Sequence, residues 1–405
     1  SLIVMVQQTL NNILKDKSKA NVRAAILNQL SEQGGQTISE LCQCLDYSTP
    51  FITKLINELV EAGLVKETGR RDNCAKRAPR VYDLMPDAGY FLGIMLGNNG
   101  ISLAICDMCG TVRYNVPKTA FPYADDSATF DSFVDTVLRY VEESGIEKTH
   151  ILQACVSIGG RVNPKEGKAY NIFTCLDEPM AETMTQRLGI PTCIDNDSRC
   201  MAYGEHLKGV CKGVDNVVFV NLSWGIGVAI IFDGKLYLGK SGFSGEFGHM
   251  HLYKNDILCH CGKTGCLETE VSGLAWHRKV RNALAEGKPS VVRERLDKNG
   301  DFLLKDLVEA VRKEDVLAIG ILQDIARELG ENLAGIINLF NPDMLVIGGE
   351  LSVLSDYLMQ PISMGIKKYS LNLVSADSQI VPSTLGEKAS VVGGCLMARH
   401  KYLRF

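Results

Sequence analysis

The chain has 405 residues, of which 46% are hydrophobic and 22% charged, and its formal net charge at pH 7 is −4. This length exceeds one small domain and the composition supports complete hydrophobic cores, so we expect two or three globular domains. No apolar run reaches the roughly 18 to 20 residues that cross a bilayer, which excludes a membrane partner. The apolar start SLIVMV lacks the features of a signal peptide, and the 14 cysteines lack a small-scaffold disulfide pattern, so we expect a cytoplasmic protein.

Charge is distributed unevenly along the chain. Residues 1–80 carry 11 Lys and Arg against 8 Asp and Glu, whereas the remaining residues carry 32 against 39. A basic N-terminal segment on an acidic body predicts that the segment contacts a polyanion.

The N-terminal segment has the pattern of a helix-turn-helix. Apolar residues at helical spacing predict a first helix over 21–33, and a short second helix begins with Thr37 or Ser39 as its N-cap. After a turn, Pro50 stands at the first position of a third helix, and LVKETG (64–69) is typical of a strand that enters a wing. The third helix of such a motif lies in the major groove of DNA.

Residues 1–82 are therefore predicted to form a winged helix-turn-helix domain that binds operator DNA. A basic wing is suited to phosphate or minor-groove contacts. The candidate DNA contacts are Thr49, Thr53, Lys54 and Asn57 in the third helix and Arg70, Arg71, Lys76 and Arg77 in the wing. The alternative is a three-helix interaction or dimerisation module with a solvated basic loop.

From residue 88 onwards, strands alternate with helices. Hairpins are predicted over 90–107 and 217–237, a long helix over 317–340 is followed by a buried strand, and VVGGC (391–395) is interpreted as a glycine turn. Alternating strands and helices predict an α/β architecture with two lobes.

The run GEFGHMHLYKNDILCHCGKTGCLE contains a predicted zinc site formed by His249, Cys259, Cys261 and Cys266. Three thiolates and one imidazole complete the tetrahedral shell of a closed structural zinc site. Glycines between the cysteines allow the backbone to fold tightly around a metal. His251 and His260 are competing ligands, and buried thiols without a metal are the alternative.

The whole chain resembles the ROK family (repressor, open reading frame, kinase), particularly its winged-helix transcriptional regulators. GEFGH followed by CHCGKTGCLE matches the zinc signature of that family, and IDNDSRCMAYGE matches its sugar-site segment. The resemblance implies a two-lobed, actin-like (ribonuclease H-like) ATPase fold with a hexose-type site. The first lobe is then expected over 88–195 and the second over 196–405, with a zinc loop at 249–266.

The resemblance also implies the sugar contacts. These are Asn196, Asp197, Glu246, His249 and Glu268. His249 would bind zinc through one ring nitrogen and face the sugar with the other. In kinases of the family, the residue matching Asp197 is the general base that deprotonates the attacking hydroxyl. Asp195 and Asp197 are alternatively helix N-caps.

Departures from the kinase pattern predict that ATP and Mg²⁺ do not bind. Met95 stands where the family kinases have a metal-handling Asp, and Trp224 stands in the second phosphate loop, where phosphates need close backbone approach. Arg199 and Arg161 are candidates for binding an anionic sugar, with surface or ion-pair arginines as the alternative.

We therefore expect a sugar-responsive repressor that binds operator DNA and a sugar or sugar phosphate as a homodimer or homotetramer. The alternative is an ATP-dependent kinase of a hexose or amino sugar with Asp197 as its general base. A third possibility is regulation by a partner protein that docks near the zinc loop.

Overall fold

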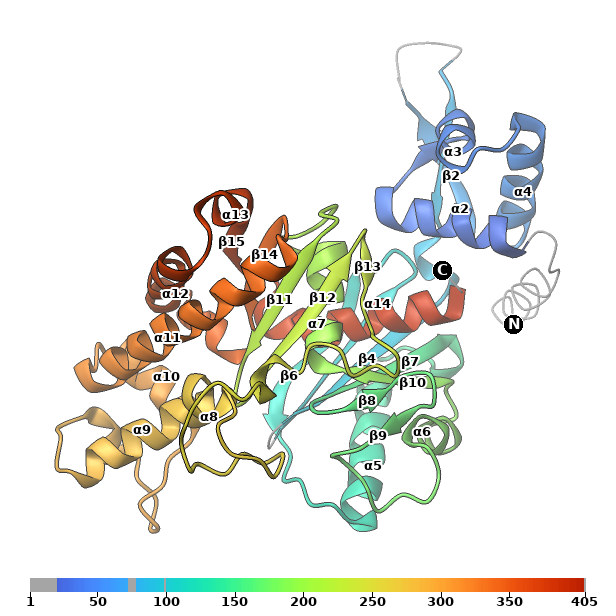
Figure 1. The fold of residues 1–405 in the computed structure, drawn as a ribbon. Helices are drawn as coiled ribbons and strands as arrows, with labels where there is room; N and C mark the ends of the chain where they lie inside the picture. Colours follow the sequence, from blue (N-terminus) through green and yellow to red (C-terminus); the bar gives the residue numbers. More distant parts are fainter. Residues whose placement is uncertain (1–19, 72–77, 98–99, 404–405) are drawn as a thin grey trace. The chain divides into compact units, whose positions relative to one another are not determined.

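The computed structural model describes residues 20–71, 78–97 and 100–403, which Figure 1 shows as a ribbon coloured along the chain. The chain divides into two compact units, Ser1–Asp195 with Val391–Phe405, and Asn196–Ser390. Among the described residues, no helix has the length and apolar character needed to cross a membrane.

The N-terminal part of the first unit is a winged helix-turn-helix. Its elements are α2 (Ala20–Gln33), β1 (Gln36–Thr37), α3 (Ile38–Leu45), α4 (Thr49–Glu61), β2 (Val65–Arg70) and β3 (Arg80–Leu84). The three strands form a sheet in the order β1-β3-β2, in which β2 and β3 are the wing. Thr37 and Glu40 form a capping box that starts α3. Of the two predicted N-caps, Thr37 and Ser39, the structure has Thr37. Ser48 is the N-cap of α4, and Pro50 lies in its first turn.

The rest of the first unit is built on a five-stranded sheet in the order β10-β7-β4-β5-β6. Its elements are β4 (Tyr90–Gly97), β5 (Gly100–Asp107), β6 (Val112–Ala120), α5 (Ser127–Glu143), β7 (Ile151–Ile158), β8 (Val162–Asn163), β9 (Lys168–Ala169), α6 (Met180–Leu188), β10 (Thr192–Asn196) and α14 (Ala389–Leu403). One face of the sheet shares a hydrophobic core with α5 and α6, which lie on the same side of it in Figure 1.

The predicted glycine turn at 391–395 is wrong, because these residues lie inside α14. Their glycines serve close packing. A Cβ on Gly93 of β4 would lie 2.0 Å from the Val391 carbonyl oxygen, and a Cβ on Gly394 would lie 3.2 Å from the Gly93 Cα. The helix and the strand approach each other closely because both carry glycine at the crossing.

The second unit is also built on a five-stranded sheet, in the order β13-β12-β11-β14-β15. Its elements are α7 (Asp197–Lys208), β11 (Val217–Leu222), β12 (Ile226–Phe232), β13 (Lys235–Leu236), α8 (Glu268–Val271), α9 (Gly273–Ala285), α10 (Leu304–Arg312), α11 (Val316–Phe340), β14 (Met344–Gly348), α12 (Ser355–Tyr369), α13 (Asn372–Asp377) and β15 (Gln379–Pro382). The predicted hairpins are present as β4–β5 and β11–β12, and the long helix is α11.

Each unit repeats one strand pattern. β4 pairs antiparallel with β5 and parallel with β7, and β11 pairs antiparallel with β12 and parallel with β14. In the second unit, alternate residues of β11, β12 and β14 form one core with α9 to α12 and another with α7. Strands buried on both faces explain the continuous apolar runs in the sequence.

The last segment of the chain belongs to the first unit. The sequence-based limits assigned 196–405 to the second lobe, whereas Val391–Phe405 groups with Ser1–Asp195. The close crossing of α14 and β4 accounts for this grouping. The other domain limits, at 82 and 88, stay predictions.

Candidate functional site

The four predicted metal ligands converge in the second unit. His249 ends a short 3-10 helix (Phe247–His249), and the three cysteines follow in a loop. The four possible ligand atoms all lie within 4.8 Å of one another. The Cys259 Sγ lies 3.6 Å from the His249 Nδ1, and the Cys261 Sγ lies 3.6 Å from the Cys266 Sγ.

These separations fit a zinc ion. With Zn–S distances of about 2.3 Å and a Zn–N distance of about 2.1 Å, tetrahedral geometry separates two sulfurs by about 3.8 Å and a sulfur from a nitrogen by about 3.6 Å. In the absence of a cation, burial raises the pKa of the Cys259 thiol to about 12 and also raises the pKa of Cys266. A divalent cation supplies the charge that would stabilise the thiolates.

Glycines close the knuckle, as the spacing predicted. Gly262 has a φ of +85° and Gly265 a φ of +75°. A Cβ on Gly265 would lie 2.3 Å from the Tyr253 carbonyl oxygen, so no larger residue fits there. The Cys259 N–H donates to the Lys263 carbonyl at 2.8 Å, which closes the turn between the first and last cysteine.

The two competing histidines differ in their surroundings. The Nδ1 of His251 lies 3.1 Å from the Thr264 carbonyl oxygen, and this residue is in neither candidate metal group. His260 is exposed, but its Nδ1 lies 2.9 Å from Glu268 Oε1 and 3.9 Å from Cys259 Sγ. His260, His249 and Glu268 therefore form a second candidate group beside the first.

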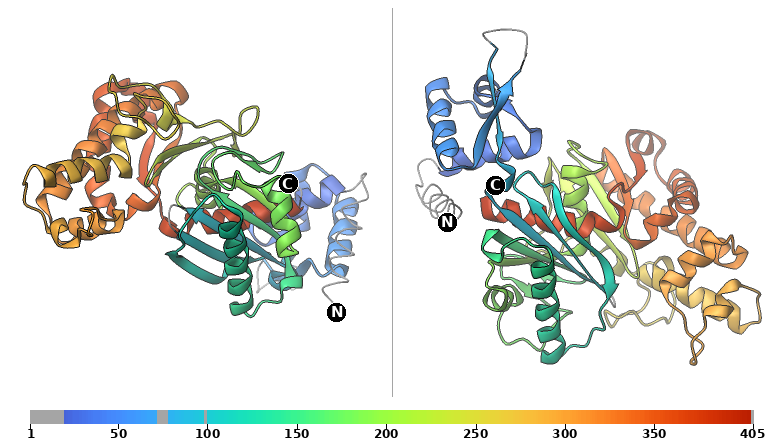
Figure 2. Two further views of the ribbon diagram at one scale, coloured as in Figure 1. Left: turned by 90° about the horizontal axis from the view of Figure 1, so that it is seen from below. Right: turned by 180° about the vertical axis from the view of Figure 1, so that it is seen from behind.

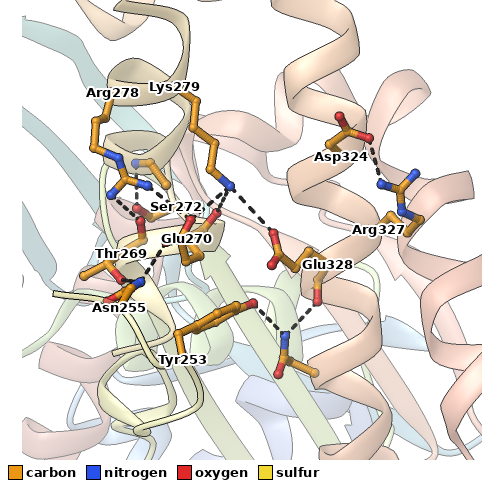
Figure 3. Close-up of polar contacts among 12 residues, drawn as sticks. Tyr253, Asn255, Thr269, Glu270, Ser272, Arg278, Lys279, Asp324, Arg327 and Glu328 are labelled. Atoms are coloured by element: carbon orange, nitrogen blue, oxygen red, sulfur yellow. Dashed lines mark hydrogen bonds and ion pairs between the residues drawn. The ribbon is translucent and has the colours of Figure 1, made fainter. Parts of the chain in front are cut away.

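A polar network anchors the loop that carries the cysteines (Figure 3). Asn255 donates to Glu270 at 2.7 Å, and Glu270 also pairs with Arg278 and Lys279, each at 3.1 Å. Lys279 reaches Glu328 on α11 at 3.6 Å. One carboxylate thus joins the loop to α9, and the lysine extends the network to α11.

At the N-terminus of α7, Asn196 and Asp197 have different roles. The N-cap is Asn196, whose side chain accepts from the Ser198 and Arg199 N–H groups, so the alternative that Asp195 or Asp197 caps the helix is wrong. Asp197 accepts from the Ser198 N–H at 2.8 Å and from Asn221 Nδ2 at 3.2 Å.

Burial raises the pKa of Asp197 to about 6, and the hydrogen bonds from Ser198 and Asn221 oppose this rise. A carboxyl with a pKa near 6 exchanges its proton close to neutral pH, as a general base or a pH-sensitive ligand contact must. Asn221 was not among the predicted site residues. An Asn near the end of an otherwise apolar strand, shortly before a hairpin turn, is a sequence signal that could have indicated a polar site there.

Glu246 and Glu268 lie beside the candidate metal cluster. His249 Nε2 lies 3.7 Å from Glu246 Oε2, so the nitrogen that does not face the cysteines points towards a carboxylate. Glu268 is 5% exposed, and its Oε2 accepts from the Ile226 N–H at 3.0 Å. Burial acts to raise the pKa of Glu268, but the hydrogen bonds from His260 and Ile226 outweigh it and lower the pKa.

The start of β12 brings these segments together. A Cβ on Gly225 would lie 2.5 Å from Glu268 Oε2, one on Gly227 would lie 2.4 Å from Ser198 Oγ, and one on Gly248 would lie 2.6 Å from the Ile226 carbonyl oxygen. Three segments therefore pack against the same few residues: the first turn of α7, the segment that ends at His249, and α8. The five predicted sugar contacts lie in these three segments.

Met95 and Ser223, which stand in the two phosphate segments of the kinase pattern, make contacts within the protein. Met95 is buried, and the Ser102 hydroxyl donates to its sulfur at 3.4 Å. The Ser223 hydroxyl donates to Asn221 Oδ1 at 2.7 Å and accepts from the Glu350 N–H at 2.9 Å. The Trp224 ring centroid lies 5.5 Å from that of His277.

The two arginines proposed for an anionic ligand differ in burial. Arg199 is 3% exposed and donates through Nη1 to the Gly242 carbonyl at 2.6 Å. Arg161 is exposed and donates through Nε to Asn171 Oδ1 at 3.2 Å. Arg161 fits the surface alternative, whereas Arg199 is a buried residue in the first turn of α7.

The candidate DNA contacts lie on α4 and the wing. Lys54 and Asn57 are exposed, whereas the Thr53 hydroxyl donates to the Thr49 carbonyl at 2.7 Å. Arg70 is exposed, and Arg71 pairs with Glu40 of α3. Lys76 and Arg77 lie outside the described residues.

The comparisons with known proteins agree with this architecture. Residues 91–401 match the ROK family, and residues 21–78 match the MarR family. The N-acetylglucosamine repressor of Escherichia coli is 25% identical over 93% of this chain and 92% of its own length.

Two solved structures extend the match to the fold. A ROK family transcriptional regulator, a homologue of the Escherichia coli Mlc protein, has a TM-score of 0.79 at 25% identity and covers 95% of this chain and 97% of its own. A ROK family glucokinase from Streptomyces griseus, in complex with glucose and AMPPNP, has a TM-score of 0.66 at 28% identity over 77% of this chain and 100% of its own. The predicted winged helix on an actin-like sugar-kinase fold is confirmed, and the chain belongs to the ROK family.

Proposed function

We propose that this protein is a sugar-responsive, DNA-binding transcriptional repressor. The observation that carries the proposal is the contrast within one site. The polar residues that face a sugar in the family are gathered at the start of β12, while Ser223 of the neighbouring phosphate loop is bonded to Asn221 and Glu350. A sugar site beside a loop that departs from the phosphate-binding pattern of kinases suits a sensor better than a phosphoryl-transfer enzyme.

The sugar contacts in this proposal are Asn196, Asp197, Glu246, His249 and Glu268. Their carboxylates, amide and imidazole can pair with several hydroxyl groups in fixed directions. Zn²⁺ held by His249, Cys259, Cys261 and Cys266 has a structural role, since it fixes the His249 ring and the loop that carries it. The name of the Escherichia coli relative supports a sugar as the effector.

The winged domain would bind operator DNA in the cytoplasm. Lys54 and Asn57 are exposed on α4, and Arg70 is exposed on the wing; Thr49, Thr53, Arg71, Lys76 and Arg77 complete the proposed contacts. A homodimer or homotetramer would present two such domains to a pseudo-palindromic operator. Sugar changes DNA affinity in this mechanism by binding more tightly to one conformation of the protein than to the other.

The proposal is tested by selecting bound fragments from genomic DNA with the zinc-loaded full-length protein. The selection is repeated with each of a panel of hexoses, pentoses, amino sugars and their phosphates. We expect a discrete set of fragments whose recovery changes with one sugar or a close group of sugars. A fragment set that no sugar changes would contradict the sensing role, and the absence of any selected fragment would contradict the DNA-binding role.

A second candidate function is an ATP-dependent sugar kinase. The raised pKa of Asp197, at about 6, favours it because a general base works best with a pKa near the working pH. An assay for ADP across the same sugars tests it, and turnover of about 1 to 100 per second would establish a kinase.

A further inference from the structure

Arg199 is a buried cation inside the site. It lies in the first turn of α7, two residues after Asp197, and is 3% exposed. Its Nη1 donates to the Gly242 carbonyl at 2.6 Å. A buried guanidinium is costly to desolvate unless hydrogen bonds and charges satisfy it, so this hydrogen bond is one of the contacts that hold the side chain in place.

The segment that Arg199 contacts has little regular structure of its own. Between β13 and the 3-10 helix at Phe247–His249, the chain has turns and bends, and Gly239, Gly242 and Gly245 have φ values of +67°, +84° and +89°. Glycines in the left-handed region give such a segment many alternative conformations in solution. Contacts with the rest of the unit must therefore select one of them.

The same segment leads directly to Glu246. Gly245 fits against β12 so closely that a Cβ there would lie 2.0 Å from the Val228 carbonyl oxygen. Three residues earlier, the Gly242 carbonyl accepts from Arg199. Arg199 and β12 thus hold the segment at two points just before the residue that carries a proposed sugar contact.

Arg199 also acts on Asp197 electrostatically. Burial raises the pKa of Asp197 to about 6, and the positive charge of Arg199 is one of the influences that oppose this rise. The charge of Arg199 therefore acts on Asp197, one proposed sugar contact. Its hydrogen bond to Gly242 holds the backbone shortly before Glu246, another proposed sugar contact.

We propose that Arg199 is a positioning residue, which joins the α7 turn carrying Asn196 and Asp197 to the segment carrying Glu246 and His249. The statement that these residues form a sugar site rests on the function proposed above. In this role the guanidinium donates to a backbone carbonyl of the protein itself, so it does not require an anionic ligand. The side chain sets the separation between two halves of the site.

Hydrogen exchange in the ligand-free, zinc-loaded full-length protein tests the proposal at residues 240–246. An Arg199→Met variant removes the donors, and an Arg199→Lys variant keeps the charge but lacks the planar fork of donors. We expect the Met variant to lose about ten- to hundred-fold of the protection at 240–246, as a hydrogen bond to a charged group implies. The Lys variant should recover part of it.

Arg327→Met is the matched control. Arg327 lies on α11 in the same unit, is largely exposed and pairs with Asp324 at 2.8 Å (Figure 3). The control should leave exchange at 240–246 unchanged. If Arg199→Met also leaves exchange at 240–246 unchanged, the proposal is overturned. If the Met variant does not fold, exchange at the wild-type rate in the Lys variant overturns the proposal.

Calorimetry with glucose, N-acetylglucosamine and xylose as probes separates this inference from the proposed function. If the wild type binds one of them, Arg199→Met should weaken that binding by the same order of magnitude as the loss of protection, with partial rescue by Lys. Undiminished affinity would overturn the role in the sugar site. If the wild type binds none of the sugars in the full panel, the proposed function fails, and the exchange result alone decides whether Arg199 positions the segment.

Discussion

At the N-terminus of α7, neutral hydrogen-bond donors hold the partly buried side chain of Asp197. Ser198 and Asn221 donate to its two oxygens, and burial still raises its pKa to about 6. A carboxylate in this position costs stability at neutral pH, and such a cost is typical of a residue retained for ligand contact. The free energy of unfolding should therefore depend on pH through this residue.

The Asp197→Asn variant tests this dependence. Because the folded-state pKa lies above the usual 3.8, the neutral form is favoured in the fold, and stability from this group is lost as pH rises towards 6. Between pH 4 and 7, the wild type should lose up to about 3 kcal/mol of unfolding free energy relative to the variant. Urea unfolding of both proteins at several pH values measures the difference.

The change of this difference with pH is the decisive quantity, because the Asn side chain alters local hydrogen bonds by an amount that does not depend on pH. Loss of zinc at low pH affects both proteins alike. Parallel stability curves for the two proteins would show that Asp197 has an ordinary pKa in the fold.

The proposed zinc ligands give a second prediction for a single residue. A Cys261→Ser variant should release its zinc to a chelator that leaves the wild type loaded, and its unfolding midpoint should fall, because the binding energy of a structural metal is folding energy. Metal analysis after dialysis and thermal unfolding measure both effects. The control is Cys175→Ser, which replaces an exposed free thiol; equal zinc retention in the two variants would exclude Cys261 as a ligand.

The convergence of the four candidate metal ligands was predictable from sequence because these residues are close in the chain. Gly262 and Gly265 lie between Cys261 and Cys266, and both have the positive φ that the tight turn requires. The contacts of His260 with Glu268 and of Asn221 with Asp197 join residues that local spacing does not relate. Such pairs depend on how hairpins and helices pack, which no periodicity in the sequence describes.

Among the elements, glycines mark where helices and strands come closest. The turn predicted at 391–395 is wrong because a pair of glycines is typical of turns, whereas here Gly394 allows α14 to lie against Gly93 of β4. The hairpins and the long helix α11 were predictable because their apolar patterns are long and regular. Glycine is ambiguous, since it is used both for turns and for close packing.

Where α11 crosses α12, two Gly→Ala substitutions in α11 should change the free energy of unfolding in opposite directions. A Cβ on Gly330 would lie 2.2 Å from the Ile362 carbonyl oxygen, whereas a Cβ on Gly335 would meet nothing within 4 Å. Gly330→Ala should lower the free energy of unfolding by about 1 to 3 kcal/mol or more through overpacking. Gly335→Ala should raise it by up to about 1 kcal/mol through helix propensity, and denaturant unfolding measures both. Equal effects of the two substitutions would mean that the helices do not cross at Gly330.

The wing gives a prediction for DNA binding. If Arg70 contacts a phosphate, Arg70→Ala should weaken binding to all sequences and reduce the slope of log affinity against log salt concentration by about 1. Fluorescence anisotropy at several salt concentrations measures the slope. Arg187→Ala, which removes an exposed arginine of α6 that pairs with Asp131, is the control and should leave the slope unchanged. An unchanged slope for Arg70→Ala would exclude Arg70 from the phosphate contacts.

Across the whole molecule, the two units repeat one strand pattern but carry different chemistry (Figure 1, Figure 2). The first carries the winged domain and has the buried Met95 where the kinase pattern has an acidic residue. The second carries the candidate metal cluster, Asp197 and the loop in which Ser223 is bonded to Asn221. The departures from the kinase pattern at Met95 and Trp224 are the reason that a sensor is proposed first and a kinase second.

We propose that the site senses a sugar without transferring phosphate to it. The most direct measurement is ADP formation by the zinc-loaded full-length protein with ATP, Mg²⁺ and a sugar that changes its binding to a selected DNA fragment. We expect the sugar to change DNA binding while no ADP forms above the background of the protein-free reaction. Sugar-dependent ADP formation at about 1 to 100 per second would contradict it and identify a kinase.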